Sequence, residues 1–261
     1  MSSVLKTTPE STRRILGVDF FTGTLDAAVD KILSRGGLVV APSAPGLALD
    51  LVKSPSYREA LTTADLAITD SGFMVLLWRL YTGEKLPRHS GLKLIRAMLE
   101  RPELKQPGAV FWVMPSASED ARNRAWLVAQ GFPITTADVY VAPHYPAGPI
   151  TDDELVRRIA ARRPRIVMLA IGGGVQERVG LMLRERITTD GNRPAVLCLG
   201  AAIAFLTGGQ VGIPTWADRL ILGWLFRLVS APRKYWRRYW EALGLARLLW
   251  RYRAEFPPLR S

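Results

Sequence analysis

Cysteine and histidine are scarce in this chain of 261 residues, which has one cysteine (Cys198) and two histidines (His89 and His144). A single cysteine excludes an intramolecular disulfide, so nothing in the composition calls for an oxidising compartment. Two isolated histidines without a cysteine cluster make no recognisable metal-binding motif. We therefore expect a protein that uses neither a disulfide nor a metal.

Long apolar runs are also missing. No uninterrupted run reaches the ~20 residues that a membrane-spanning helix needs. The first residues, MSSVLKTTPESTRRILG, lack the apolar core of a signal peptide. The residues are 48% hydrophobic and 22% charged, with no long polar or repetitive tract, which predicts a folded chain. We expect a cytoplasmic protein that contacts the inner face of the plasma membrane without crossing it.

Negative charge is in short supply, and the excess of positive charge is uneven. The formal net charge is +12, and residues 211–261 contain ten Lys or Arg against three Asp or Glu, with five of the eight tryptophans. At helical spacing, residues 233–253 combine aromatic and basic side chains. This pattern is typical of a helix in the interface of an anionic membrane. Docking of the aromatic stripe onto the protein's own core, and RNA binding, are the alternatives.

Apolar segments separated by helical patterns of about ten to fifteen residues follow one another along the chain. This alternation predicts an α/β fold, with a mainly parallel sheet and helices on both faces. We expect a core at residues 14–210 and a C-terminal helical appendage at 211–261. The expected strands lie in LVVAPSAP, LAITDSG, AVFWVMP, TTADVYVAP, RIVMLAIGGG and AVLCLGAA.

Asp70 comes directly after the expected strand LAIT and is followed by Ser71 and Gly72. Ligands of parallel sheets bind at the carboxyl ends of strands, so a carboxylate at this edge can accept a proton from a substrate hydroxyl. The alternative is structural, because an aspartate before Ser-Gly can cap the next helix. We expect Ser43 and Gly200 at the same edge.

Three glycines, Gly172, Gly173 and Gly174, open the segment GGGVQERVG. The segment matches neither the GxGxxG pattern of dinucleotide-binding loops nor a P-loop. Gln176 and Glu177 fall on the first turn of the next helix, where they can bind a sugar or base while backbone N–H groups face a phosphate. Close packing of the glycines is the structural alternative.

Arg88 lies beside a glycine-containing loop, and its guanidinium suits phosphate oxygens. Together with Asp70-Ser71-Gly72, the Gly-x-x-Gln-Glu element at 173–177 and the block GAAIAFLTGGQVGIPTWADRLILGWLFRLVSAPRKYWRRY at 200–239, it resembles the WecG/TagA/CpsF family of bacterial glycosyltransferases. The resemblance extends from Ile15 to Tyr239. The block at 200–239 is its most specific part.

The resemblance implies a Rossmann-like α/β catalytic core at residues 14–210 and an inverting glycosyltransferase without a cofactor. It would move a sugar from a nucleotide-diphosphate donor, expected to be a UDP-sugar, to a polyprenyl-diphosphate-linked saccharide at the cytoplasmic membrane face. It implies Asp70 as general base, Gln176, Glu177 and Arg88 in the site, and appendage arginines on the donor diphosphate. Those arginines are Arg219, Arg227 and Arg233. A homo-oligomer stays open, and we expect no nucleic acid partner.

Four positions depart from the family pattern: Ala41 and Ser43 replace the usual Thr and Asn, Ser71 replaces Gly, and Gly223 replaces Glu. Donor recognition is therefore expected to differ. Two other classes of function stay open on the residues alone. A nucleotide-binding oxidoreductase would need a complete GxGxxG after the first strand, which GVDFFTG does not provide. A basic RNA-binding protein would show salt-sensitive RNA affinity.

Overall fold

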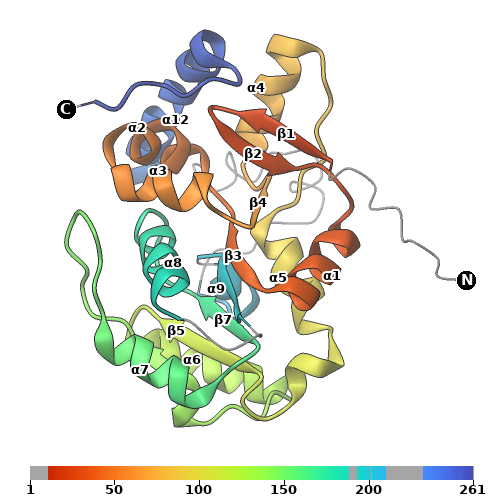
Figure 1. The fold of residues 1–261 in the computed structure, drawn as a ribbon, viewed down its shortest axis with the longest axis vertical. Coiled ribbons are helices and arrows are strands. Elements are labelled where there is room, and N and C mark those ends of the chain that lie inside the picture. Colours follow the sequence, from red (N-terminus) through yellow and green to blue (C-terminus); the bar gives the residue numbers. More distant parts are fainter. Residues whose placement is uncertain (1–10, 188–192, 201, 210–231, 261) are drawn as a thin grey trace, which may run out of the picture.

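The computed structural model describes residues 11–187, 193–200, 202–209 and 232–260, and these form an α/β fold around one sheet (Figure 1). The strand order is β1-β2-β4-β3-β8-β7-β5-β6. β1 and β2 pair antiparallel, and the other neighbouring strands of this sheet pair parallel. The predicted mainly parallel sheet is confirmed. The strands are β1 (Thr12–Ile15), β2 (Val18–Phe21), β3 (Gly37–Val40), β4 (Leu66–Ile68), β5 (Val110–Met114), β6 (Val139–Val141), β7 (Ile166–Leu169) and β8 (Ala195–Cys198).

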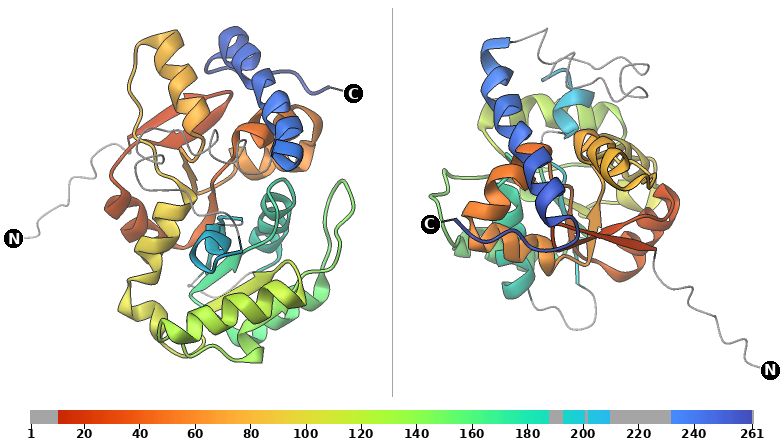
Figure 2. Two further views of the ribbon diagram at one scale, coloured as in Figure 1. Left: turned by 180° about the vertical axis from the view of Figure 1, so that it is seen from behind. Right: turned by 90° about the horizontal axis from the view of Figure 1, so that it is seen from above.

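Helices cover both faces of the sheet, as the two further views in Figure 2 show. Successive strand residues alternate between two buried apolar clusters, because side chains of a strand point to opposite faces. The first face carries the π-helix η1 (Gly46–Asp50), α2 (Leu51–Lys53), α3 (Pro55–Thr62), α4 (Gly72–Thr82), α7 (Asp153–Arg162), α8 (Val175–Arg186) and α12 (Pro232–Tyr252). The second carries α1 (Leu25–Arg35), α5 (Gly91–Leu99), α6 (Ala117–Ala129) and α9 (Ala202–Leu206). Two short 3-10 turns, η2 (Pro102–Lys105) and η3 (Thr136–Asp138), complete the described elements.

The helix starts follow from side-chain capping. Thr24 is the N-cap of α1 and accepts a hydrogen bond from the backbone N–H of Ala27, and Gly36 ends that helix with a positive φ. Ser71 and Ser90 cap α4 and α5 in the same way. The sequence analysis did not identify α5 or the β1–β2 hairpin, whose turn places Leu16 and Gly17 at positive φ.

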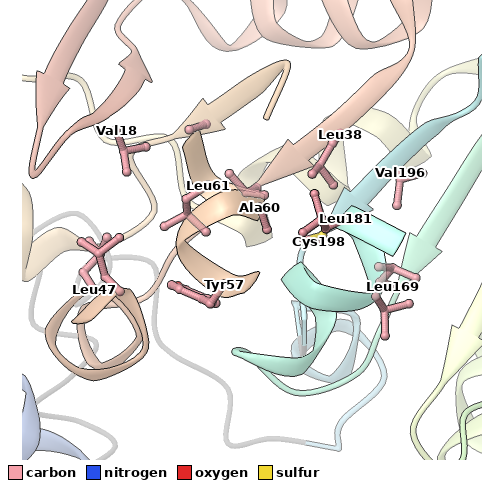
Figure 3. Packing of buried hydrophobic residues seen from close by; sticks show 14 of the residues in the cluster. Val18, Leu38, Leu47, Tyr57, Ala60, Leu61, Leu169, Leu181, Val196 and Cys198 are labelled. Carbon is pink, nitrogen blue, oxygen red and sulfur yellow. The ribbon is translucent and has the colours of Figure 1, made fainter. Parts of the chain in front are cut away.

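Helix α8 approaches the sheet closely above β3 and β8. A methyl group on Gly180 would lie 2.7 Å from Leu38 Cδ1 and 2.8 Å from Cys198 Sγ, so only glycine fits there. Figure 3 shows Leu38 and Cys198 together with Leu181 of α8 in this part of the core. The close approach fixes the first turn of α8 at the carboxyl edge of the sheet.

The last helix, α12, packs against η1 and α4, and the chain after it runs back over the core (Figure 1). Leu245, Leu248 and Leu249 of α12 are buried. The backbone N–H of Leu16 donates to Arg253 O, and that of Arg260 donates to Val52 O. The C-terminal segment is therefore part of the folded core. The boundary predicted between residues 210 and 211 falls outside the described residues.

Candidate active site

The carboxyl ends of β3, β4 and β8 meet around the start of α5. A methyl group on Gly91 would lie 3.7 Å from Leu199 O, 3.8 Å from Asp70 Oδ1 and 3.9 Å from Ala41 Cβ. After β3 the chain passes to η1 on one face of the sheet, and after β8 it passes to α9 on the other. Neighbouring strands whose connections leave on opposite faces open a crevice in which α/β proteins bind ligands.

Asp70 lies at this crevice and is partly exposed. Its Oδ1 accepts a hydrogen bond of 2.8 Å from the backbone N–H of Gly91, the first residue of α5. The N-cap of the following helix, α4, is Ser71, whose Oγ accepts from Met74 N at 3.2 Å. The capping alternative for Asp70 is therefore wrong for α4. The aspartate is instead held by the N-terminus of a helix that the sequence analysis missed.

The loop before α5 ties Arg88 to the end of β4. Arg88 Nε donates to the backbone carbonyl of Asp70 at 3.4 Å, and Thr69 Oγ1 donates to Pro87 O at 2.5 Å. The buried ring of His89 is within 2.6 Å of Gly23 O through Nε2. These bonds place the arginine next to the candidate base and give His89 a structural role.

Four other predicted site residues lie at the same edge. Ser43 follows β3, and its Oγ accepts from Gly46 N at 3.4 Å at the start of η1. Ser71 is 6% exposed and its Oγ caps α4, so its side chain contributes to structure, and Gly72 begins that helix. Gly200 follows β8 with a φ of +59°.

The three glycines before α8 differ in their surroundings. Gly174 has a φ of +85°, and a methyl group on it would lie 3.0 Å from Asp50 Oδ2, so its conformation and its surroundings both require glycine. Gly172 and Gly173 are exposed, and methyl groups there would meet nothing within 4 Å. Close packing therefore does not explain these two glycines. Their exposed backbone is open to close approach by a ligand.

Gln176 and Glu177 are buried at the start of α8, with 4% and 1% of their surface exposed. Glu177 Oε2 accepts from Gly174 N at 2.7 Å, and Oε1 accepts from Gln176 Nε2 at 3.0 Å. Gln176 lies beside Gly200, on which a methyl group would be 3.4 Å from the amide nitrogen and oxygen. The crevice therefore has Asp70 on one side of the Leu199–Gly200 segment and Gln176 on the other.

Burial raises the pKa of Glu177 to about 7, with a further contribution from the nearby carboxylate of Asp50, although hydrogen bonds to its oxygens act in the opposite direction. The sequence analysis expected this helix start to bind a phosphate. Gly174 N is already bonded to Glu177, and Gln176 N donates to Gly172 O. An ionised carboxylate at this position opposes a second anion, so arginines suit the diphosphate better than this helix start.

Asp50 and Tyr57 are neighbours of the site that sequence reasoning missed. Asp50 ends the π-helix η1, an uncommon element that is frequent at functional sites. Burial raises the pKa of Tyr57 above its ordinary value, and the carboxylates of Glu177 and Asp50 add to this effect. Of the elements that were missed near the site, α5 could have been found in the sequence, because Ser90 is a typical N-cap and GLKLIRAML has apolar residues at helical spacing.

The appendage residues of the predicted site are only partly covered by the structure. Arg219 and Arg227 lie outside the described residues. Arg233 lies in the first turn of α12, and its side chain lies outside the described part of the structure. Within the described ranges, no group of three His, Cys, Asp or Glu side chains is placed to hold a metal ion.

The outward face of α12 is apolar and basic. Trp240, Leu243 and Trp250 are 70%, 54% and 63% exposed, and Arg247 and Arg251 are exposed beside them. The ring of Trp250 meets Tyr81 of α4 edge-on at 5.3 Å. Leu245, Leu248 and Leu249 dock the helix on the core, and the docking alternative is wrong for Trp240, whereas Trp250 is mostly exposed but keeps an edge contact with Tyr81. Among the helices that the structure describes, none is long and apolar enough to cross a membrane.

The chain is similar to known proteins over most of its length. The family model "Glycosyl transferase WecG/TagA/CpsF family" matches residues 13–258. A Bacillus spizizenii protein named N-acetylglucosaminyldiphosphoundecaprenol N-acetyl-beta-D-mannosaminyltransferase is 24% identical over 234 residues, which cover 87% of this chain and 86% of the relative. A Bacillus subtilis (strain 168) protein of the same name is 23% identical over 204 residues, covering 77% and 75%. The family match extends over nearly the whole chain, from the β1–β2 hairpin to the segment after α12, and so this protein is a glycosyltransferase that belongs to the WecG/TagA/CpsF family.

Proposed function

We propose that this glycosyltransferase moves a sugar from a nucleotide-diphosphate donor, a UDP-sugar, to a polyprenyl-diphosphate-linked saccharide during synthesis of a bacterial surface polysaccharide. The observation that carries the proposal is the placement of Asp70, partly exposed and held by Gly91 N at 2.8 Å where the ends of β3, β4 and β8 meet. The names of the two relatives, which describe transfer to N-acetylglucosaminyl-diphosphoundecaprenol, support the acceptor class.

In the proposed reaction the acceptor hydroxyl oxygen attacks the anomeric carbon on the side opposite the diphosphate. A new carbon–oxygen bond forms, the bond to the diphosphate oxygen breaks, and the nucleoside diphosphate leaves with the electron pair. Asp70 takes the hydroxyl proton as general base. Arg88 beside it, and Arg219, Arg227 and Arg233 of the appendage, supply the positive charge that the leaving diphosphate needs without a metal ion.

The test compares the wild type with Asp70→Asn, which keeps an acceptor oxygen for Gly91 N but is a far weaker base. Turnover of a UDP-sugar and a short-chain lipid-linked acceptor should fall by about 10²- to 10⁴-fold. The affinity for UDP, measured by calorimetry, should stay within about threefold. An Asn variant with wild-type turnover would rule out the assigned base. A wild type that binds none of a panel of nucleoside diphosphates would rule out the donor class.

We also propose that the protein associates with the cytoplasmic face of the membrane through α12. The exposed stripe of Trp240, Leu243 and Trp250, with Arg247 and Arg251 alongside, supports this proposal. Tryptophan favours the headgroup region, and each basic residue adds about 1 kcal/mol near an anionic surface. Such an orientation would bring the crevice to an acceptor whose lipid stays in the bilayer.

The membrane proposal is tested with point variants, because removal of the whole segment would also remove the buried leucines of α12. Trp240→Ser with Trp250→Ser should reduce flotation with vesicles rich in phosphatidylglycerol, while turnover on a water-soluble acceptor stays unchanged. Val128→Ser is the matched control, since Val128 is 55% exposed on α6, on the other face of the sheet. Equal flotation of both variants would contradict the proposal.

A further inference from the structure

Gln176 carries an unpartnered acceptor inside the protein. Its Oε1 is buried without a hydrogen-bond partner among the described residues, although the whole side chain is only 4% exposed. An unsatisfied buried polar atom is costly, and native proteins keep few of them. The position of this atom, at the carboxyl ends of β7 and β8, calls for an explanation.

Glu177 sets the direction of the Gln176 amide. An ionised carboxylate only accepts hydrogen bonds, and Glu177 Oε1 accepts from Gln176 Nε2 at 3.0 Å. Turning the amide by half a turn would bring its oxygen against the carboxylate. The same carboxylate holds Gly174 N at 2.7 Å through Oε2. One side chain therefore fixes both the glycine segment and the amide.

The backbone next to the amide on one side belongs to glycine. A methyl group on Gly200 would lie 3.4 Å from the amide and 3.5 Å from Ile171 O, so the bare backbone of Gly200 adjoins it. Gly172 and Gly173, in the loop between β7 and α8, are exposed, and methyl groups on them would meet nothing within 4 Å. A ligand that lies along this backbone comes close to Gln176 without meeting a side chain at these glycine positions.

We propose that Glu177 is a positioning residue that directs Gln176 Oε1 to accept a hydrogen bond from a hydroxyl or N–H group of the nucleotide sugar. The inference rests on the proposed function for the identity of the ligand. It differs from direct binding by Glu177, whose oxygens are both occupied inside the protein. In this role Glu177 acts only through its neighbour.

The charge of Glu177 decides the orientation. The titratable groups that face the Glu177 carboxyl are Asp50 from η1, Tyr57 from α3 and Cys198 from β8. Arg178, on the same helix, points away from it and donates to Gly174 O and to the carbonyls of residues 146 and 148. No one of these facing groups is a cation, and the pKa of Glu177 is raised to about 7. A neutral Glu177 must donate a proton, and the nearest acceptor is then Gln176 Oε1 after the amide turns.

Glu177→Gln tests the positioning of Gln176 by Glu177 without removing the helix cap. The new amide can accept from Gly174 N with its oxygen, but its NH2 group then faces Gln176 and turns that amide round. In protein labelled with 15N at its four glutamines, the side-chain amide signals of Gln176 should differ between the wild type and the variant at about pH 8.5. The wild-type signals should approach those of the variant at about pH 5.5, below a pKa of about 7. Identical signals at the higher pH would overturn the proposal.

A double-mutant cycle gives the functional readout. Glu177→Gln and Gln176→Leu should each raise the KM for the UDP-sugar about tenfold, the equivalent of one lost hydrogen bond, with kcat within about twofold. The double variant should be no worse than either single variant, because Glu177 acts through Gln176. Additive effects on KM, or an unchanged KM in Glu177→Gln, would refute the positioning role. A wild type without UDP-sugar turnover would refute the proposed function alone, since the amide signals need no ligand.

Discussion

Glu177 makes the stability of the native protein depend on pH in a defined direction. Its pKa is raised from an ordinary value of 4.5 to about 7 in the native state, chiefly by burial. Between these two values the native protein holds a proton that the unfolded chain has lost. The free energy of unfolding should therefore fall as the pH rises from about 4.5 to about 7, and this contribution should stay constant above pH 7.

The magnitude follows from the same two values. A tenfold change in proton affinity corresponds to about 1.4 kcal/mol, so a pKa that moves from 4.5 to about 7 amounts to about 3 kcal/mol. Other groups also titrate in this range, and the variant Glu177→Gln, which stays neutral, subtracts them. Urea unfolding of both proteins at a series of pH values gives the difference in free energy of unfolding. The wild type should lose up to about 3 kcal/mol relative to the variant between about pH 5 and about pH 8. Parallel curves for the two proteins would show that Glu177 does not keep a proton in this range.

Two further predictions concern the glycine segment and the last helix. Gly172→Ala should leave the Tm unchanged, because a methyl group there meets no protein atom, and should raise the KM for the donor that the backbone is proposed to contact. Gly46→Ala is the control and should lower the Tm, because its methyl group would lie 2.4 Å from the Tyr57 hydroxyl. An equal loss of Tm in both variants would contradict the assignment of Gly172 to a ligand. Leu248→Ala should lower the free energy of unfolding by about 2–5 kcal/mol, since Leu248 is 3% exposed. Leu243→Ala on the same helix, at a side chain 54% exposed, should change it by less than about 0.5 kcal/mol, and equal losses would show that the buried face of α12 is not what docks it.

The sheet and most of its helices could be predicted because their signals are local. Apolar runs such as AVFWVM, and caps such as Thr24, specify an element from its own residues. The strand order could not be predicted this way. The pairing of β3 with both β4 and β8 brings together segments far apart in the chain, and short strands buried on both faces give no local signal for their neighbours.

The candidate site shows the same division. Asp70, Arg88, Gln176 and Glu177 could be selected from the sequence as polar residues at strand ends. Their partners could not, because Gly91 N reaches Asp70 only once α5 lies against the end of β4. Asp50 is a charged residue with no motif around it, and its place beside Gly174 depends on the π-helix.

Comparison with two other buried acids, Asp152 and Asp138, sets off the polar pair at α8. Asp152, 9% exposed, accepts hydrogen bonds from Tyr140, Tyr145 and Leu155 N, and Asp138, 1% exposed, pairs with Arg162 and Thr135. These acids are satisfied within the protein, and their role is structural. The pKa of Glu177 is instead raised, by burial and by the nearby carboxylate of Asp50, and the neighbouring Gln176 Oε1 lacks a hydrogen-bond partner. Glu177 also holds Gly174 N at the start of α8, and the acceptor that stays unpartnered on Gln176 at the carboxyl edge of the sheet supports the proposed binding of the donor there.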